Sequence, residues 1–198
     1  MSYERYWGNI HEQSDKLQEL LSSYWHQYSD FGNWQFWVVL ASLVLPLVLL
    51  YFTVDRTRIF EVFFFGYTVH MLWAYIDIAL GRSGYLTHTF FLTPLLPNAT
   101  NITASILPVG FLLLYQYCTN HQKNFYLYTI LLSAVFSFGL APLEHHFKFI
   151  DSGKGMSLFY IFLIDIGITL VAYWVTRLLV KVKAAAYDKV EKERRKNV

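Results

Sequence analysis

Charged residues and cysteine are scarce in this chain of 198 residues. Asp, Glu, Lys and Arg make up 15% of the sequence, well below the roughly 25% of soluble proteins. Cys118 is the only cysteine, which excludes an intramolecular disulfide and a cysteine-based zinc site. We also expect no secretory signal peptide, because residues 1–33 have no suitable apolar core and no small-residue cleavage site.

The motifs of several enzyme classes are missing too. The sequence contains no Walker loop, no GxSxG motif and no dinucleotide-binding glycine fingerprint. No lysine lies within the long apolar segments, so a retinal Schiff base has no point of attachment. The sequence therefore favours a non-enzymatic protein, predicts no nucleic-acid partner and indicates no particular cofactor.

Hydrophobic residues dominate what is present, at 55% of the chain. Several apolar runs approach the roughly 20 residues that a helix needs to cross a bilayer. We predict an all-α integral membrane bundle of five transmembrane helices, at about 34–54, 59–80, 102–118, 125–143 and 157–180. Residues 86–96 are apolar but too short to cross, and Pro94 and Pro97 interrupt them, which indicates a re-entrant or interfacial segment.

Segments of different composition flank the predicted bundle of residues 34–180. Residues 1–33 are typical of an amphipathic interfacial helix, and residues 181–198 of a basic cytoplasmic tail helix. The positive-inside rule predicts an outer N-terminus and a cytoplasmic C-terminus in the cell membrane. Eleven of the 16 Lys and Arg residues then lie inside: Arg56, Arg58, Lys123, Arg177, Lys181, Lys183, Lys189, Lys192, Arg194, Arg195 and Lys196.

Three ionisable residues occur within the second predicted span. Glu61 lies near the cytoplasmic edge, close to Arg56 and Arg58, which predicts a snorkelled or salt-bridged residue at the membrane interface. His70 and Asp77 are seven residues apart and therefore share one face of the helix. Small residues on the same stripe, including Gly66, would let another helix approach closely.

The later spans carry narrow faces of small and polar residues. In the fourth span, Ser133, Ser137, Ala141 and Glu144 follow one face. In the fifth, Asp165, Thr169, Ala172 and Thr176 do the same. Helices in lipid pack through faces of this kind, so we predict that both are buried in the bundle.

Several of the ionisable residues gather toward the expected outer side of the membrane. Asp77 and Glu144 lie at the outer ends of their spans, and Asp165 lies in the outer half of the fifth. Such residues inside a membrane mark functional sites by default. We predict a polar cavity, roofed by residues 83–100, whose ligand or ion pathway candidates are His70, Asp77, Arg82, Glu144 and Asp165.

Three interpretations of these groups remain open. They satisfy one another structurally, with Asp77 bound to Arg82 and Asp165 bound to Thr hydroxyls or a histidine. They bind or conduct an ion or a small polar molecule, which is the function we prefer. Alternatively, Glu144, His145 and His146 hold a metal in a membrane-embedded enzyme. Glu-His-His is a weak motif, because adjacent histidines on one helix point about 100° apart.

The expected partners follow from where the apolar spans and the basic residues lie along the chain. The lipid bilayer surrounds the spans, and the basic tail attracts anionic lipid at the inner leaflet. The sequence leaves a homo-oligomer or a larger membrane complex open.

Two stretches carry a family resemblance: Asp77–Tyr85, DIALGRSGY, and Ile106–Gln116, which begins Ile-Leu-Pro-Val and ends Tyr-Gln. With Glu144, they resemble an uncharacterised family of small multi-spanning membrane proteins of spore-forming Bacillus-type bacteria. In that family an aspartate precedes a basic-Gly-Tyr connection, and a later span carries a late glutamate. The resemblance covers roughly residues 60–178, and the long N-terminal helix is less typical. It implies a bacterial plasma or spore membrane location and no activity.

Overall fold

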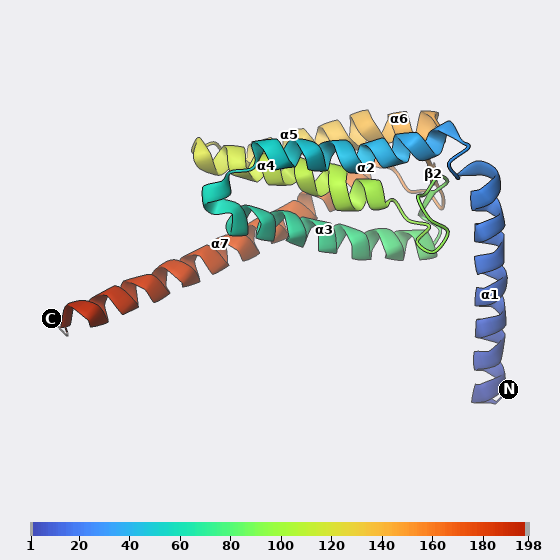
Figure 1. The fold of residues 1–198 in the computed structure, drawn as a ribbon, viewed down its shortest axis with the longest axis horizontal. Helices are drawn as coiled ribbons and strands as arrows, with labels where there is room; N and C mark the ends of the chain where they lie inside the picture. The colour runs from blue at the N-terminus through green and yellow to red at the C-terminus, as the bar shows by residue number, and fades with distance from the viewer. Residues whose placement is uncertain (1, 197–198) are drawn as a thin grey trace.

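Five long apolar helical segments run side by side in the structure, a computed structural model that describes residues 2–196 (Figure 1). Each segment is long and apolar enough to cross a membrane. The all-α class and the five candidate spans predicted from the sequence are thereby confirmed, and the chain is a multi-pass membrane protein by length and composition. The segments are α2 (Trp34–Thr53), Arg56–Arg82 with α3 (Ile59–Arg82), Ile102–Asn120, Phe125–His146 and Leu158–Lys189 within α7 (Leu158–Lys196).

Two of these segments contain a turn of π-helix. The third consists of η2 (Ile102–Ile106) and α4 (Leu107–Asn120), and the fourth of α5 (Phe125–Val135), η3 (Phe136–Leu140) and α6 (Ala141–His146). Pro108 and Pro142 each occupy the second position after the π turn. A proline ring clashes with the carbonyl four residues earlier, and a π turn relieves that clash by widening the helix.

The third segment lies at the centre of the bundle. Half of its most apolar window is buried, a larger share than in any of the other four candidate spans. A Cβ atom added at Gly66 of α3 would lie 2.5 Å from Cδ1 of Leu112. A larger residue there would force the Leu112 side chain to shift, so Gly66 allows the close helix contact that the sequence predicts.

The N-terminal helix α1 (Tyr3–Tyr28) crosses one end of the bundle and extends beyond it (Figure 1). None of its residues is buried. Its C-terminal part is fixed to the loop that follows β1: Trp25 Nε1 donates to the carbonyl of Phe91 at 3.0 Å, and Ser29 Oγ donates to the same oxygen at 2.9 Å. The remaining part exposes Tyr and Leu side chains, as expected of an interfacial helix.

A short two-stranded antiparallel sheet, which we call the hairpin although its strands are distant in the sequence, covers the same end of the bundle. Strand β1 (Leu86–His88) pairs antiparallel with β2 (Ile150–Ser152), which joins the connection after α3 to the loop before α7. The rest of the predicted re-entrant or interfacial segment is irregular and lies between the bundle and α1. We call the end of the bundle that β1 and β2 cover the hairpin end. The opposite end is called the tail end, and it contains residues 54–58, 121–124 and the extension of α7.

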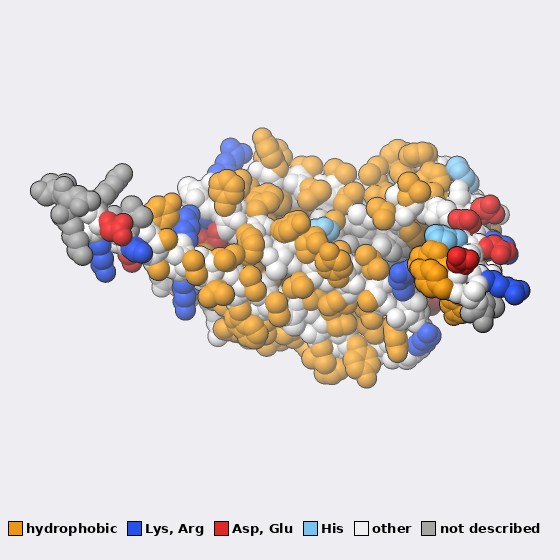
Figure 2. All heavy atoms as spheres, turned by 90° about the horizontal axis from the view of Figure 1, so that it is seen from below, with side chains coloured by type: hydrophobic (Ala, Val, Ile, Leu, Met, Phe, Trp, Pro, Cys, Tyr) orange, Lys and Arg blue, Asp and Glu red, His pale blue; other side chains and the backbone are white. Residues whose placement is uncertain are grey.

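The surface of the bundle is apolar along its length. Figure 2 shows hydrophobic side chains over the middle of one face, with charged side chains gathered toward the two ends. This distribution matches the apolar core and polar surfaces of a bilayer. Helix α7 continues past the tail end into the predicted basic tail. Residue 1 of the predicted N-terminal segment and residues 197–198 of the predicted tail lie outside the described residues.

Candidate functional site

A small cavity lies at the hairpin end, between the bundle and the hairpin. Its volume is about 50 Å³, and its ionisable lining residues are Asp77, His88, Glu144 and Asp165. Neither lysine nor arginine is among the described residues that line it. A water molecule needs roughly 10–15 Å³ of such space. The cavity therefore holds a few waters or a small ion, and it is far below the 300–1,000 Å³ typical of sites for organic ligands.

The carboxylate of Asp77 is held by a histidine from the hairpin. Asp77 is 4% exposed, near the end of α3, and its Oδ1 lies 2.8 Å from Nε2 of His88. The pairing of β1 with β2 places His88 over the end of α3. Arg82 is exposed, and the predicted pairing of Asp77 with Arg82 is wrong. The partner of Asp77 is instead His88 of β1.

Asp165 of α7 links three elements across the interior. It is 1% exposed; Trp73 Nε1 of α3 donates to its Oδ1 at 3.1 Å, and Ser137 Oγ of η3 donates to its Oδ2 at 3.2 Å. The expected threonine or histidine partners are therefore incorrect. Both donors are neutral. Among the described side chains, no cation forms an ion pair with this buried carboxylate.

Glu144 of α6 completes the acidic lining. It lies close enough to Asp77 and His88 to interact with both electrostatically. The neighbouring His145 and His146 are exposed instead. Across residues 2–196, no group of three or more His, Cys, Asp or Glu side chains is arranged to hold a metal ion. The predicted metal set of Glu144, His145 and His146 therefore does not converge.

His70 belongs to a different part of the bundle. Its Nδ1 lies 2.8 Å from the carbonyl oxygen of Thr103 in η2. It lines a separate apolar pocket with residues such as Leu50 and Pro108. His70 and Asp77 thus share a helix stripe, as predicted, without sharing a cavity, because that stripe meets different neighbours at different depths.

A row of buried hydroxyls extends from Asp165 toward the tail end. Thr169 follows Asp165 by one turn, and Ser133 and Thr129 precede Ser137 by one and two turns. Thr129, Ser133 and Thr169 are fully buried, and among the described residues their hydroxyls have no hydrogen-bond partner. Buried hydroxyls without a protein partner are uncommon in folded proteins. The predicted burial of the two polar faces is confirmed except at Glu144, which is half-buried; the buried members are Ser133, Ser137, Ala141, Asp165, Thr169, Ala172 and Thr176.

The tail end pairs its charges near the surface. Arg58 Nη2 lies 2.5 Å from Oε1 of Glu61, and the Tyr115 hydroxyl donates to the same oxygen at 2.5 Å. The salt-bridged alternative predicted for Glu61 is thus confirmed. Hydrogen bonds from the hydroxyl and the N–H of Thr57 lower the pKa of Asp55, which keeps this second carboxylate charged beside Arg58.

Comparisons add no homologue to this description. No family model, no curated protein and no solved structure matches the chain. The site itself holds three carboxylates and one imidazole in a largely apolar lining, and no lysine or arginine is among the described residues that line it. Groups of this kind accept protons and bind cations.

Proposed function

We propose that this membrane protein binds a small cation, with the proton as its principal ligand, in the cavity at the hairpin end. The observation that carries the proposal is the lining itself. Asp77, Glu144 and Asp165 line a cavity of about 50 Å³ among mostly apolar residues, with His88 as the single basic group of the described lining. Buried negative charge without compensation is costly, so the site gains free energy when a proton or a cation neutralises it.

The dimensions of the cavity support a proton over larger ligands. A space of about 50 Å³ excludes organic solutes. A dehydrated metal ion would need converging ligands, and the described side chains offer no group of three. A proton needs only one carboxylate oxygen at a time, and the hydroxyls of Thr129, Ser133 and Thr169 offer further acceptors between Asp165 and the tail end.

A purely structural role is the competing explanation. Trp73 and Ser137 give Asp165 two hydrogen bonds that connect α3, η3 and α7. In that case the carboxyl group would keep one protonation state while the protein is folded. Titration of the group therefore separates the two roles.

We propose an outer N-terminus and hairpin end, and a cytoplasmic tail end. The excess of Lys and Arg at the tail end supports this orientation. The resemblance in Asp77–Tyr85 supports a bacterial plasma or spore membrane. A membrane-impermeant thiol reagent tests the orientation in a Cys118→Ala background. It should label Ser14→Cys in intact cells and Ala185→Cys only after lysis; labelling of both from one side would refute it.

The binding proposal is tested by infrared spectroscopy of the purified full chain during a pH titration. A carboxyl stretching band that appears as the pH falls should be lost in Asp165→Asn and altered in Asp77→Asn. Asp151→Asn is the matched control, because Asp151 is an exposed carboxylate at the same end. Asn keeps an acceptor oxygen for Trp73, and its NH2 group can donate to the Ser137 hydroxyl, so folding should persist. An unchanged band in both site variants, or variants that simply fail to fold, would favour the structural role.

A further inference from the structure

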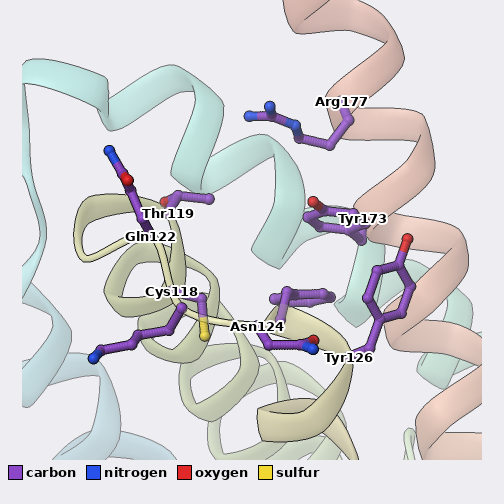
Figure 3. Close-up of a pocket in the computed structure, with 9 residues that line it drawn as sticks. Cys118, Thr119, Gln122, Asn124, Tyr126, Tyr173 and Arg177 are labelled. Atoms are coloured by element: carbon purple, nitrogen blue, oxygen red, sulfur yellow. The ribbon is translucent and has the colours of Figure 1, made fainter.

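A second, larger pocket opens at the tail end, between the α4–α5 turn and α7. Its volume is about 560 Å³. Figure 3 shows Arg177 and Tyr173 projecting from α7, with Gln122, Asn124 and Tyr126 contributed by the turn and the start of α5. It lies at the opposite end of the bundle from the acidic cavity and shares no residue with it.

The lining of this pocket is rich in hydrogen-bond donors and contains no acidic residue. Lys123 and Arg177 are its two cationic side chains. Gln122 and Asn124 add amide groups, and Tyr126 adds a hydroxyl. Trp174 Nε1 donates to the Tyr126 oxygen at 3.3 Å, which leaves the hydroxyl proton free to face a ligand.

The two cations are not neutralised by the nearby carboxylates. Glu61 is paired with Arg58 at 2.5 Å, and it attracts Arg177 only at longer range. Arg177 also interacts with the neutral hydroxyl of Tyr115, which does not cancel its charge. Neither Lys123 nor Arg177 has a carboxylate oxygen within 4.0 Å among the described side chains. The pocket therefore carries net positive charge and attracts an anion.

The backbone around the turn strengthens this attraction. Gln122 has a φ of 52°, in the left-handed region, which turns the chain sharply between the two helices. Asn124 Oδ1 then caps α5 by accepting from the N–H of Leu127 at 3.2 Å. The first residue of α5, Phe125, lines the pocket, so the positive end of the helix dipole adds to the two side-chain cations.

The position of the pocket indicates the type of anion. Tyr126 is the second residue of its candidate span, and Trp174 of α7 donates to its hydroxyl oxygen, so both rings lie near the tail end. Aromatic residues near the ends of spans lie at the head-group level of a bilayer. Arginine and amide donors suit a phosphate group, which accepts several hydrogen bonds at once. We propose that this pocket binds a phosphate group, carried by a phospholipid head group or by a soluble phosphate. This site is independent of the proposed proton site.

Binding to the purified full chain in neutral detergent tests the proposal. The probes are phosphatidylglycerol, diacylglycerol as the lipid without phosphate, and inorganic phosphate; native mass spectrometry and thermal stabilisation report binding. We expect Arg177→Gln to weaken binding of the phosphate-bearing probe by about tenfold, since hydrogen bonds to charged groups are among the strongest in proteins. Lys181→Gln removes a similar charge from α7, one turn beyond Arg177 and outside the lining, and should change affinity less than about twofold.

The probes that bind distinguish a phospholipid head group from a soluble phosphate. Binding of phosphatidylglycerol alone identifies the lipid head group, and binding of inorganic phosphate as well identifies a site for soluble phosphates. The proposal is overturned if neither binds better than diacylglycerol, or if Lys181→Gln weakens binding as much as Arg177→Gln. Arg177→Lys, which retains the charge, and Lys123→Gln supply the same comparison if Arg177→Gln does not fold.

Discussion

The two ends of the bundle handle charge in opposite ways. At the hairpin end, Asp77 and Asp165 are almost fully buried beside a small cavity. At the tail end, Lys123 and Arg177 are exposed and line an open pocket. A buried charge has to be neutralised by what it binds, whereas an exposed charge stays ionised and selects a counterion. The two proposed sites therefore differ in the sign of the charge they would bind: a cation at the hairpin end and an anion at the tail end.

The connections at each end produce this difference. At the tail end, residues 54–58 and 121–124 join the helices by short turns, which leave the helix ends open to water. At the hairpin end, residues 83–100 and 147–157 are longer, and β1 and β2 close over the polar groups. Exclusion of water by this cover makes the carboxylates expensive to keep charged.

Asp165→Ala should have the largest effect of the substitutions that compare the buried charges of the hairpin end with the exposed charges of the tail end. It leaves the donors of Trp73 and Ser137 buried without an acceptor, so we expect it to lower the free energy of unfolding by about 2–4 kcal/mol. Asp165→Asn, which keeps an acceptor for Trp73, should cost about 1 kcal/mol or less. Equilibrium unfolding in mixed detergent micelles measures both. Equal losses for the two variants would show that the charge itself, rather than the hydrogen bonds, holds this end together.

The hairpin cover can be disturbed separately from the carboxylates by Gly153→Ala. A Cβ atom there would lie 2.4 Å from the backbone oxygen of Gly84, so the two connections must move apart. We expect a loss of about 1–3 kcal/mol in stability and faster amide hydrogen exchange in β1 and β2. Gly139→Ala is the control, because no atom outside its own helix lies within 4 Å of the added Cβ. Unchanged exchange in Gly153→Ala would mean that the hairpin does not seal the cavity.

Features set by helix periodicity could be predicted from the sequence. The burial of Asp165, Thr169 and Ser133 follows from their spacing of about one turn on otherwise apolar helices. The pair Arg58–Glu61 follows from a separation of three residues, which places both side chains on one face.

Features that depend on irregular connections could not be predicted. His88 lies in a strand of three residues whose partner strand starts more than 60 residues later, and no periodicity signals such a strand. Tryptophan in a span usually lies at the membrane interface or packs against other helices, so nothing in the sequence identifies Trp73 as a donor to Asp165. The separation of His70 from Asp77 depends on where η2 meets α3, which helix spacing alone does not determine.

At the tail end, Arg58→Gln should have a smaller and salt-dependent effect. Arg58 binds Glu61 and also donates to Thr119 and Asn120 of α4, at 3.0 and 2.6 Å. Since its side chain is 27% exposed, we expect a loss of about 1 kcal/mol. Raising the salt from about 0.1 M to about 1 M should shrink this loss, because the Debye length falls from about 10 Å to about 3 Å. The loss in Asp165→Ala should not respond to salt; if both respond alike, the two ends do not differ in their exposure to water.

The smallest effect on stability is expected for Lys123→Gln. Lys123 is exposed in the α4–α5 turn and forms no ion pair with a described carboxylate, so unfolding should change by less than about 0.5 kcal/mol. The same substitution should nevertheless weaken binding of a phosphate-bearing probe, because it removes one of the two lining cations. An open, charged pocket is expected to bind its ligand without contributing to the stability of the empty protein. A clear loss of stability in Lys123→Gln would instead make this lysine part of the packing of the turn.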